Sequence, residues 1–173
     1  MRKSGFTLVE MLAVLLILAL LAAALTAGLS TARNNAWRAK ARDTCRQLCT
    51  AWNAYLLDCR KFPDKIPNNG KELTAEYVNI KWLSPEWLSE EEKKRHNGRI
   101  YLEISETEKN DGLKDHWDQP IYFSLDMDYD GQVDNKYPDA FDPRVEQVKA
   151  TSISWSLGDP NRKKRVDNPI VVW

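Results

Sequence analysis

Charged side chains are absent from the whole stretch between Met11 and Ala32. A helix of about 20 apolar residues, rising about 1.5 Å per residue, is long enough to cross a lipid bilayer. The composition therefore argues against a purely cytosolic globular protein. The chain also lacks an excess of positive charge, since 25 basic side chains balance 25 acidic ones. Nothing in this balance indicates a nucleic-acid-binding protein.

Proline is absent before Pro63, and the only glycine between Phe6 and Cys59 is Gly28. Proline and glycine interrupt helices, whereas the alanine and leucine that dominate this segment favour them. We therefore expect one helix from Phe6 to Cys59, ended by Phe62-Pro63 because the residue before proline avoids helical backbone. The outer half of this helix carries an apolar face that we expect to pack on a small sheet. Its members are Cys45, Leu48, Cys49, Trp52, Tyr55, Leu56 and Cys59.

The remaining charges are unevenly divided along the chain. Basic side chains outnumber acidic ones in residues 33–60, whereas acidic side chains outnumber basic ones in residues 61–173. This distribution predicts three parts, which are an apolar anchor (1–32), a basic neck (33–60) and an acidic head (61–173).

The first thirty residues allow two interpretations on physical grounds. A basic start, an apolar stretch and the small residues of 30–32 are compatible with a cleaved signal peptide. The stretch is longer than the roughly 7–15 residues of a removable signal, which favours a retained anchor. Glu10 lies inside it, and a carboxylate in lipid costs roughly 2.5–3.5 kcal/mol at a helix centre and less near the ends. Glu10 is therefore either a functional residue that needs a partner or a residue at headgroup level.

The segment Gly5-Phe6-Thr7-Leu8-Val9-Glu10, with the apolar helix after it, closely resembles the processing motif of the type IV pilin and pseudopilin superfamily. The resemblance implies that a membrane peptidase cleaves between Gly5 and Phe6 and methylates the new amino terminus of Phe6. It also implies that Glu10 pairs with the terminal amine of a neighbouring subunit, which supplies the positive partner that a buried carboxylate needs. Residues 1–5 would lie in the cytoplasm, although the neck is more basic than this leader, against the positive-inside rule.

The head begins with a polar, proline-containing segment in which we expect short helices. Ser84-Pro85 predicts a helix start, because proline fits the first helical position. Ser89 and Glu92 have the spacing of a capping box, and Gly98 is the expected stop. Alternating apolar residues predict strands at 99–105, 121–125 and 151–156, and residues 170–173 are expected to close the sheet edge or pack beneath it.

Three cysteines lie on the helix, and none follows Cys59. Cys45 and Cys49 are four residues apart, so their Cβ atoms are about 5–6 Å apart, whereas a disulfide needs about 3.5–4.5 Å. We expect thiols that pack as small hydrophobic groups, with pairing to another subunit as the alternative. Trp82 and Trp87 are expected to anchor the core rather than to form exposed contacts.

The segment from Asp115 to Tyr122 resembles a signature of the major pseudopilins of type II secretion, with matches at Asp115, Trp117, Pro120 and Tyr122. The segment from Trp155 to Asp159, with the terminal Trp173, resembles the carboxy-terminal tract of the same group. These resemblances favour a secretion pseudopilin over a pilus subunit. The pilin-type disulfide loop near the carboxyl end is absent from the sequence.

The segment from Asp126 to Asp134 resembles the first half of an EF-hand-type calcium loop. Carboxylates at every second position, followed by Gly131, suit a hard cation that binds oxygen. Tyr137 stands where glutamate would close the loop, so Asp139 or Asp142 would have to substitute. The alternative is a β-hairpin that turns at Asp130-Gly131 with solvated carboxylates. The candidate calcium ligands are Asp126, Asp128, Asp130, Gln132 through its carbonyl, and Asp134.

A second candidate calcium position follows from the resemblance, because the major pseudopilins carry their site in the later tract. Asp159 and Asp167 are the weaker candidate ligands there. The basic run of residues 162–165 lies between them and disfavours a cation.

The sequence therefore predicts an α+β, pilin-like fold, with a long amino-terminal helix packed on a small antiparallel sheet. Its expected parts are a leader (1–5), a transmembrane assembly helix (6–32), an amphipathic continuation (33–60), a variable region (61–98) and a sheet with the acidic loop (99–173). The resemblance implies a structural subunit, not an enzyme, in the periplasmic pseudopilus of a type II secretion system. A type IV pilus (minor) pilin is the first alternative, and a secreted calcium- or ligand-binding module with an ordinary signal peptide is the second.

The implied partners follow from the same resemblance. They are like subunits and minor pseudopilins, the prepilin peptidase and N-methyltransferase, an assembly platform in the inner membrane, and the lipid bilayer. The implied location is a single pass through the inner membrane with the head in the periplasm.

Overall fold

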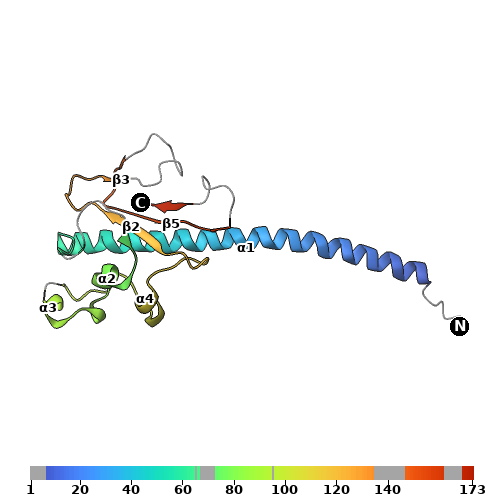
Figure 1. Cartoon of the computed structure of the whole chain (residues 1–173), viewed down its shortest axis with the longest axis horizontal. Coiled ribbons are helices and arrows are strands. Elements are labelled where there is room, and N and C mark those ends of the chain that lie inside the picture. Colours follow the sequence, from blue (N-terminus) through green and yellow to red (C-terminus); the bar gives the residue numbers. More distant parts are fainter. Residues whose placement is uncertain (1–6, 65, 67–72, 95, 135–146, 162–168) are drawn as a thin grey trace. The chain divides into compact units, whose positions relative to one another are not determined.

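The computed structural model describes residues 7–64, 66, 73–94, 96–134, 147–161 and 169–173. The chain divides into two compact units, Met1–Trp37 and Arg38–Trp173. The long helix α1 (Leu8–Cys59) contributes to both of them. The predicted α+β class is confirmed, because α1 is accompanied by a small antiparallel sheet (Figure 1).

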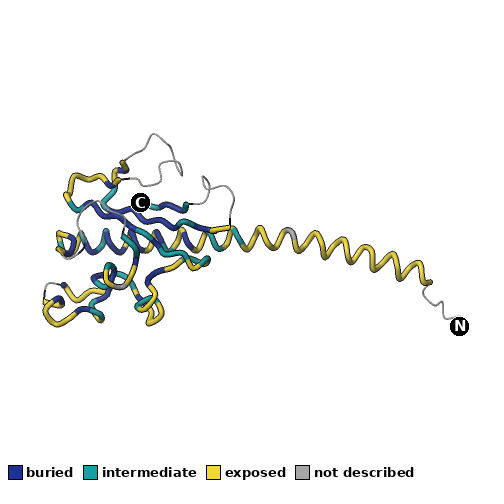
Figure 2. Tube along the Cα trace, viewed as in Figure 1, coloured by how far each residue is buried: buried dark blue, intermediate teal, exposed yellow. Residues whose placement is uncertain are grey.

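The described part of the first unit consists of α1 alone. Its large apolar side chains are exposed in the single chain, as Leu8 at 79% and Leu25 at 72% illustrate (Figure 2). By length and composition, α1 is the one described helix that could cross a membrane. An apolar surface of this size needs lipid or other helices to cover it.

The outer half of α1 buries the face that the apolar periodicity predicts. Cys45, Leu48 and Trp52 are fully buried, and Leu56 and Cys59 are half-buried. The helix ends at Cys59, because Arg60 adopts a left-handed conformation (φ 63°) and its N–H still donates to the Leu56 carbonyl at 2.8 Å. The helix therefore ends before Phe62-Pro63, the expected stop.

Four antiparallel strands form the main sheet in the order β1-β2-β5-β6. The strands are β1 (Leu73–Thr74), β2 (Ile121–Leu125), β5 (Ser152–Ser156) and β6 (Ile170–Val172). The central pair, β2 and β5, is in register from Ile121 opposite Ser156 to Leu125 opposite Ser152. The predicted strands at 121–125 and 151–156 are thereby confirmed, and of the two alternatives for the carboxyl-terminal residues, closing the sheet edge is confirmed by β6.

The two faces of β5 pack against different parts of the head. Its serines, Ser152, Ser154 and Ser156, are buried, and the Ser152 hydroxyl donates to the Cys49 carbonyl on α1 at 3.4 Å. Small side chains at this contact allow helix and sheet to approach closely. Ile153 and Trp155 alternate with the serines and pack with a second, two-stranded sheet, β3 (Val133–Asp134) and β4 (Gln147–Val148).

Short helices cover another side of the outer part of α1 (Figure 1). They are α2 (Tyr77–Ile80), the 3-10 turns η1 (Lys81–Leu83) and η2 (Pro85–Trp87), α3 (Glu90–Lys93) and α4 (Glu106–Asp111). The predicted start at Ser84-Pro85 and the predicted capping box of Ser89 and Glu92 are confirmed. A second capping box, Ser105 with Glu108, starts α4. Gly112 ends α4 at φ 75°, where an added Cβ would lie 2.9 Å from the Ala75 carbonyl oxygen.

The predicted strand at 99–105 is wrong. The N–H groups of Tyr101 and Leu102 both donate to the Leu83 carbonyl, so this segment is bonded to a 3-10 turn rather than to a strand. Ile100 is 48% exposed, whereas Ile104 is buried. The expected helix stop at Gly98 is also wrong, since α3 ends at Lys93.

The cysteine and tryptophan predictions are largely confirmed. Cys45 and Cys49 are free and buried, and Cys59 is free and half-buried. Burial raises the pKa of the Cys45 thiol to about 12 and that of Cys49 to about 11, so both stay protonated at neutral pH. Trp82 is buried, and Trp87 is half-buried beneath the Lys109 ammonium, which lies 3.8 Å from its ring centroid.

His96 makes the head sensitive to acid. Its Nδ1 accepts from the Gly98 N–H at 3.0 Å, so Nε2 carries the proton and donates to the Trp82 carbonyl at 3.0 Å. Burial lowers the pKa of His96 from 6.5. Below pH 6.5 the unfolded chain therefore binds a proton before the folded chain does, and stability falls by up to about 1.4 kcal/mol per pH unit. We expect thermal melting in detergent between pH 7.5 and 5.5 to show this loss.

The matched controls are the two histidine variants. His96→Gln should flatten the profile over this range, whereas His116→Gln, at an exposed position, should keep it. A profile that flattens equally in both variants would contradict the assignment.

Candidate functional site

The amino-terminal end of α1 holds Glu10 in a capping box. The Glu10 Oε2 accepts from the Thr7 N–H and from the Thr7 hydroxyl, both at 2.8 Å. In return, the Glu10 N–H donates to the Thr7 Oγ1 at 3.3 Å. Thr7 is thus the N-cap and Glu10 the third helical residue, which is the reciprocal arrangement of a capping box.

This cap is a feature that the sequence interpretation missed, although Thr7 and Glu10 have the required spacing. Oε2 receives both bonds, and no described residue donates to Oε1. The carboxylate is therefore partly satisfied within its own chain and retains an oxygen for a second donor. The expected cleavage position between Gly5 and Phe6 lies outside the described residues.

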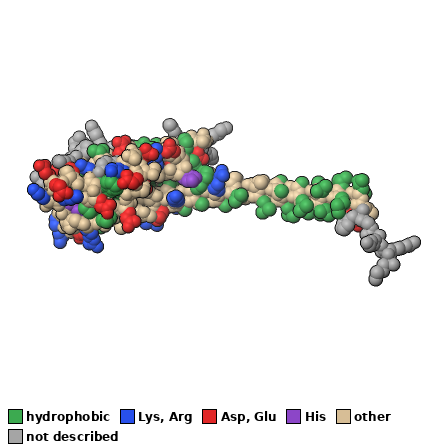
Figure 3. Space-filling model, turned by 90° about the horizontal axis from the view of Figure 1, so that it is seen from below, with side chains coloured by type: hydrophobic (Ala, Val, Ile, Leu, Met, Phe, Trp, Pro, Cys, Tyr) green, Lys and Arg blue, Asp and Glu red, His purple; other side chains and the backbone are tan. Residues whose placement is uncertain are grey.

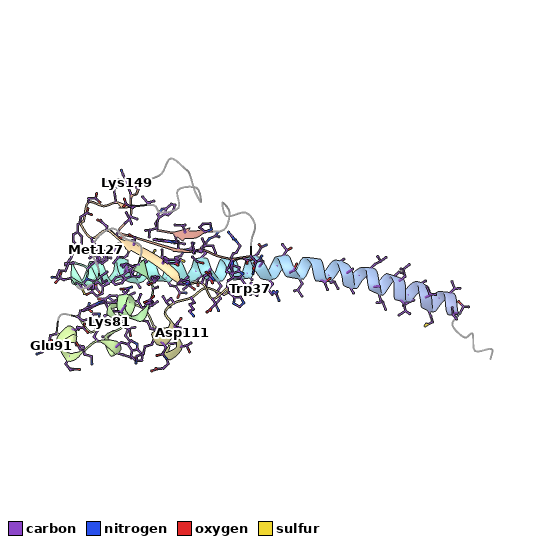
Figure 4. The ribbon with its side chains drawn as sticks, in the orientation of Figure 1. Trp37, Lys81, Glu91, Asp111, Met127 and Lys149 are labelled. Carbon is purple, nitrogen blue, oxygen red and sulfur yellow. The ribbon has the colours of Figure 1, made fainter. Side chains whose placement is uncertain are left out.

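The acidic loop brings three of its five candidate ligands together. One carboxylate oxygen from each of Asp126, Asp128 and Asp130 lies within 4.8 Å of the other two. Asp126 is buried, and its carboxylate accepts from the N–H groups of Asp130 at 3.1 Å and Gly131 at 2.9 Å. These bonds fold the loop back onto Asp126, so that the carboxylates converge. Met127, which belongs to this loop, is labelled in Figure 4.

The loop is held by its own backbone conformation and by a contact with Phe62. Gly131 (φ 81°) and Tyr129 (φ 61°) have left-handed conformations that reverse the chain. The Tyr129 hydroxyl accepts from the Phe62 N–H at 2.9 Å, and the two rings stack with centroids 6.0 Å apart. The loop is therefore tied to the end of α1 rather than suspended in solvent.

The burial of Asp126 also changes the pKa of its carboxyl group. Burial, reinforced by the neighbouring Asp128, raises the pKa of the Asp126 carboxyl group. The raised pKa means that the negative charge is held there at a cost. A cation at the convergence point would offset that cost.

The carboxylates of Asp134 and Asp159 do not join this cluster. Asp134 lies on β3, and its Oδ1 accepts from the Gln147 amide on β4 at 3.3 Å. Gln132 is exposed, and its N–H donates to Asp130 Oδ1 at 2.8 Å. Asp159 accepts from the Asn161 N–H at 2.9 Å. The proposed closing residues Asp139 and Asp142, and also Tyr137 and Asp167, lie outside the described residues.

The alternative prediction of a β-hairpin at Asp130-Gly131 is wrong. A hairpin would pair β3 with β2, but β3 pairs with β4, with Val133 opposite Val148. The chain turns out of the main sheet after Leu125 and enters a separate ribbon. The acidic loop is thus a junction between two sheets.

Asp115 joins the two tracts near the carboxyl end that carry the pseudopilin resemblance. Its Oδ1 accepts from the N–H groups of Trp117 at 2.8 Å and Gln119 at 2.9 Å. Its Oδ2 accepts from the hydroxyl of Ser156 at the end of β5, and Ser156 Oγ accepts from the Gly158 N–H at 3.0 Å. One carboxylate therefore shapes the turn before β2 and holds it to β5.

The comparisons with known proteins bear on the amino terminus. Residues 1–26 match the family model described as the prokaryotic N-terminal methylation motif. No curated protein and no solved structure matches the chain significantly. The motif and the fold together support a type IV pilin-like or pseudopilin subunit, which is a structural protein that is anchored by a single apolar helix, processed by a prepilin peptidase and polymerised with similar subunits.

The role of Asp115 leads to a stability prediction. Asp115→Ala leaves two backbone N–H groups and the Ser156 hydroxyl without their acceptor, so the free energy of unfolding should fall by about 2–4 kcal/mol. Asp118→Asn is the matched control, because Asp118 is exposed and its carboxylate forms an ion pair with Lys114 at the surface. Asparagine also tolerates the left-handed backbone of this position (φ 60°). Its effect should stay within about 0.5 kcal/mol. Chemical denaturation in detergent measures both, and equal losses would refute the role of Asp115.

Proposed function

We propose that the chain is a pseudopilin that assembles into the periplasmic pseudopilus of a type II secretion system. The observation that carries the proposal is the methylation motif at residues 1–26, placed at the start of an apolar helix whose outer half packs on a small sheet. The contact between Asp115 and Ser156 adds support, because it joins the two tracts that resemble the major pseudopilins.

The proposed activity is mechanical. The peptidase would cleave after Gly5, and Phe6 would become the methylated first residue. The apolar surface of α1 would pass from lipid to the helices of neighbouring subunits, both of which cover it. Glu10 would offer its carboxylate to the new terminal amine of a neighbour, while the acidic head stays in the periplasm and the anchor in the inner membrane.

The mature amino terminus tests this proposal. Mass spectrometry of the protein from membranes of its native host should find a chain that begins at methylated Phe6. Glu10→Gln keeps an acceptor for the Thr7 N–H but removes the charge, so it should be processed normally and lose most filament assembly. Thr7→Ala is the matched control, because it removes the cap and keeps the charge, and it should still assemble.

Two results would refute the proposal. A soluble chain that begins near Arg33 would indicate an ordinary signal peptide and an exported binding module. Normal assembly of Glu10→Gln would exclude the pairing role of this carboxylate. Deletion of the gene should abolish protein secretion; loss of surface pili with intact secretion would instead identify a pilus subunit.

We further propose that Asp126, Asp128 and Asp130 bind calcium. Their oxygens lie within 4.8 Å of one another, and calcium takes six to eight oxygen ligands, often including backbone carbonyls and water. Gln132 could add its carbonyl. The bound ion would neutralise the buried Asp126 and brace the junction between the two sheets.

Calcium should therefore stabilise the protein. At a calcium concentration about 100 times the Kd, the gain of about 2.7 kcal/mol should raise the Tm by about 5–10 °C. Asp128→Asn should abolish the shift without lowering the Tm in a chelator, because it removes a carboxylate that repels Asp126. Glu103→Gln, at an exposed position outside the loop, should leave the shift intact. An equal response to magnesium, or no response to calcium, would refute the site.

A further inference from the structure

The basic neck carries positive charge that is largely exposed in the described part of the chain. Within the neck, we call the five basic residues between positions 33 and 46 the neck residues. Asp43 is the only acidic residue in this range. The Asp43 carboxylate accepts from the Gln47 amide at 2.8 Å. Four neck residues are exposed and one, Arg38, is half-buried. The neck residues are Arg33, Arg38, Lys40, Arg42 and Arg46.

The exposed neck residues have no acidic partner within the described part of the chain. The ion pairs described there lie elsewhere, for example between Lys81 and Glu92 at 2.8 Å and between Arg99 and Asp58 at 3.0 Å. Exposed charges of one sign attract mobile counterions or a surface of opposite charge. Among the described residues, Arg33, Lys40, Arg42 and Arg46 therefore form an exposed surface that can bind negative charge.

The neck lies next to the membrane-length apolar segment by covalent connection. Arg33 directly follows Ala32, the last residue of the uncharged stretch. Along α1, Lys40 and Arg42 follow Ala32 by about 12 Å and 15 Å at 1.5 Å per residue. Cα–Cβ bonds in a helix tilt toward its amino terminus, and long basic side chains extend along the surface. The neck residues therefore follow the apolar segment on the same helix, and Figure 3 shows Lys and Arg side chains next to the end of the hydrophobic stretch.

Trp37 adds a second, independent feature of a membrane interface. The Arg33 guanidinium carbon lies 4.6 Å from the centroid of the Trp37 ring. Tryptophan is enriched at the level of lipid headgroups, because its ring is apolar and its N–H is polar. A stacked arginine at that level presents a planar donor group to phosphate oxygens.

We propose that the neck binds the anionic phospholipid surface of the leaflet from which α1 emerges, through phosphodiester headgroups such as those of phosphatidylglycerol. This inference rests on the membrane anchor of the proposed function, but not on assembly or on the type of filament. The acidic head of a second copy is the competing negative surface. Lipid is favoured because the covalent link to the anchor holds the neck beside the bilayer, whereas contact with another head requires assembly.

Lipid binding also explains why the chain places so much positive charge on this side of the anchor. The positive-inside rule disfavours basic residues there. A neck held by headgroups would set the depth of α1 in the membrane before assembly and would resist its extraction.

The test uses the full chain in detergent and native mass spectrometry, with phosphatidylglycerol and phosphatidylcholine of identical acyl chains as probes. Each basic residue near an anionic surface contributes roughly fivefold in affinity. We expect the wild-type chain to prefer phosphatidylglycerol by at least about tenfold, and the variant Arg33→Gln/Lys40→Gln/Arg42→Gln to lose most of that preference. Added sodium chloride should weaken the preference in the wild type.

The matched control removes the same charge from the head. Lys61→Gln/Lys94→Gln/Lys149→Gln changes three exposed residues and should keep the preference, with circular dichroism showing that both triple variants are folded. Single variants add a distance test, since Arg33→Gln should lose more than Arg46→Gln, which lies farthest from the anchor.

Four outcomes would overturn the proposal. They are no preference in the wild type, an equal loss in the control, displacement of the lipid by inorganic phosphate at matched ionic strength, and a neck variant that keeps its lipid preference but loses assembly. The last result would assign the neck to the acidic surface of a second copy. Release of the wild-type chain from membranes by alkaline carbonate would instead refute the anchor, and with it the proposed function.

Discussion

The head depends on one contact above all others, the packing of the outer half of α1 against β2 and β5. Trp52 is fully buried at its centre and stacks on Phe123 of β2, with ring centroids 5.6 Å apart. Phe62 meets the same indole edge-on at 6.0 Å. The serines of β5 leave room for the helix backbone. Since β2 and β5 are fixed by this contact, the acidic loop after β2 and the Asp115 turn before it are held in place by the same core.

The inner half of α1, unlike the outer half, does not pack on the sheet. From Met11 to Leu25 its side chains are apolar around the whole circumference, and none of them is covered within the described chain. A helix of this kind is stable in lipid or among other helices but not in water. One continuous helix thus serves two environments, and the change between them coincides with the first basic residues of the neck.

Residue periodicity was sufficient to predict the outer half of α1, β2 and β5, because each has one regular period and a buried face. The inner half of α1 was predictable from its apolar composition and its lack of proline. Periodicity failed at 99–105, where Ile100, Leu102 and Ile104 alternate as a strand would. Alternation shows that a segment is partly buried but not which partner covers it, and the carbonyl of Leu83 is 16 or more residues away in sequence from the N–H groups it binds.

The candidate site also contains residues whose position could be predicted from the sequence and residues whose position could not. The convergence of Asp126, Asp128 and Asp130 follows from local spacing and from Gly131, and could be predicted. The position of Asp134 depends on the pairing of β3 with β4, and strands of two residues are too short to predict from their pattern. The cap formed by Thr7 follows from spacing alone, whereas the interpretations of Glu10 concerned a partner in another subunit or a place at headgroup level.

That cap would also affect the energetics of the proposed assembly. Without any donor, a carboxylate in the membrane would give each unassembled subunit a high free energy. Addition to a filament would then be strongly favoured over loss. With Thr7 already bonded to Oε2, a subunit that joins the proposed filament would gain a donor at Oε1 and not its first donor. The cap would therefore reduce the difference in free energy between a subunit in the membrane and a subunit in the proposed filament.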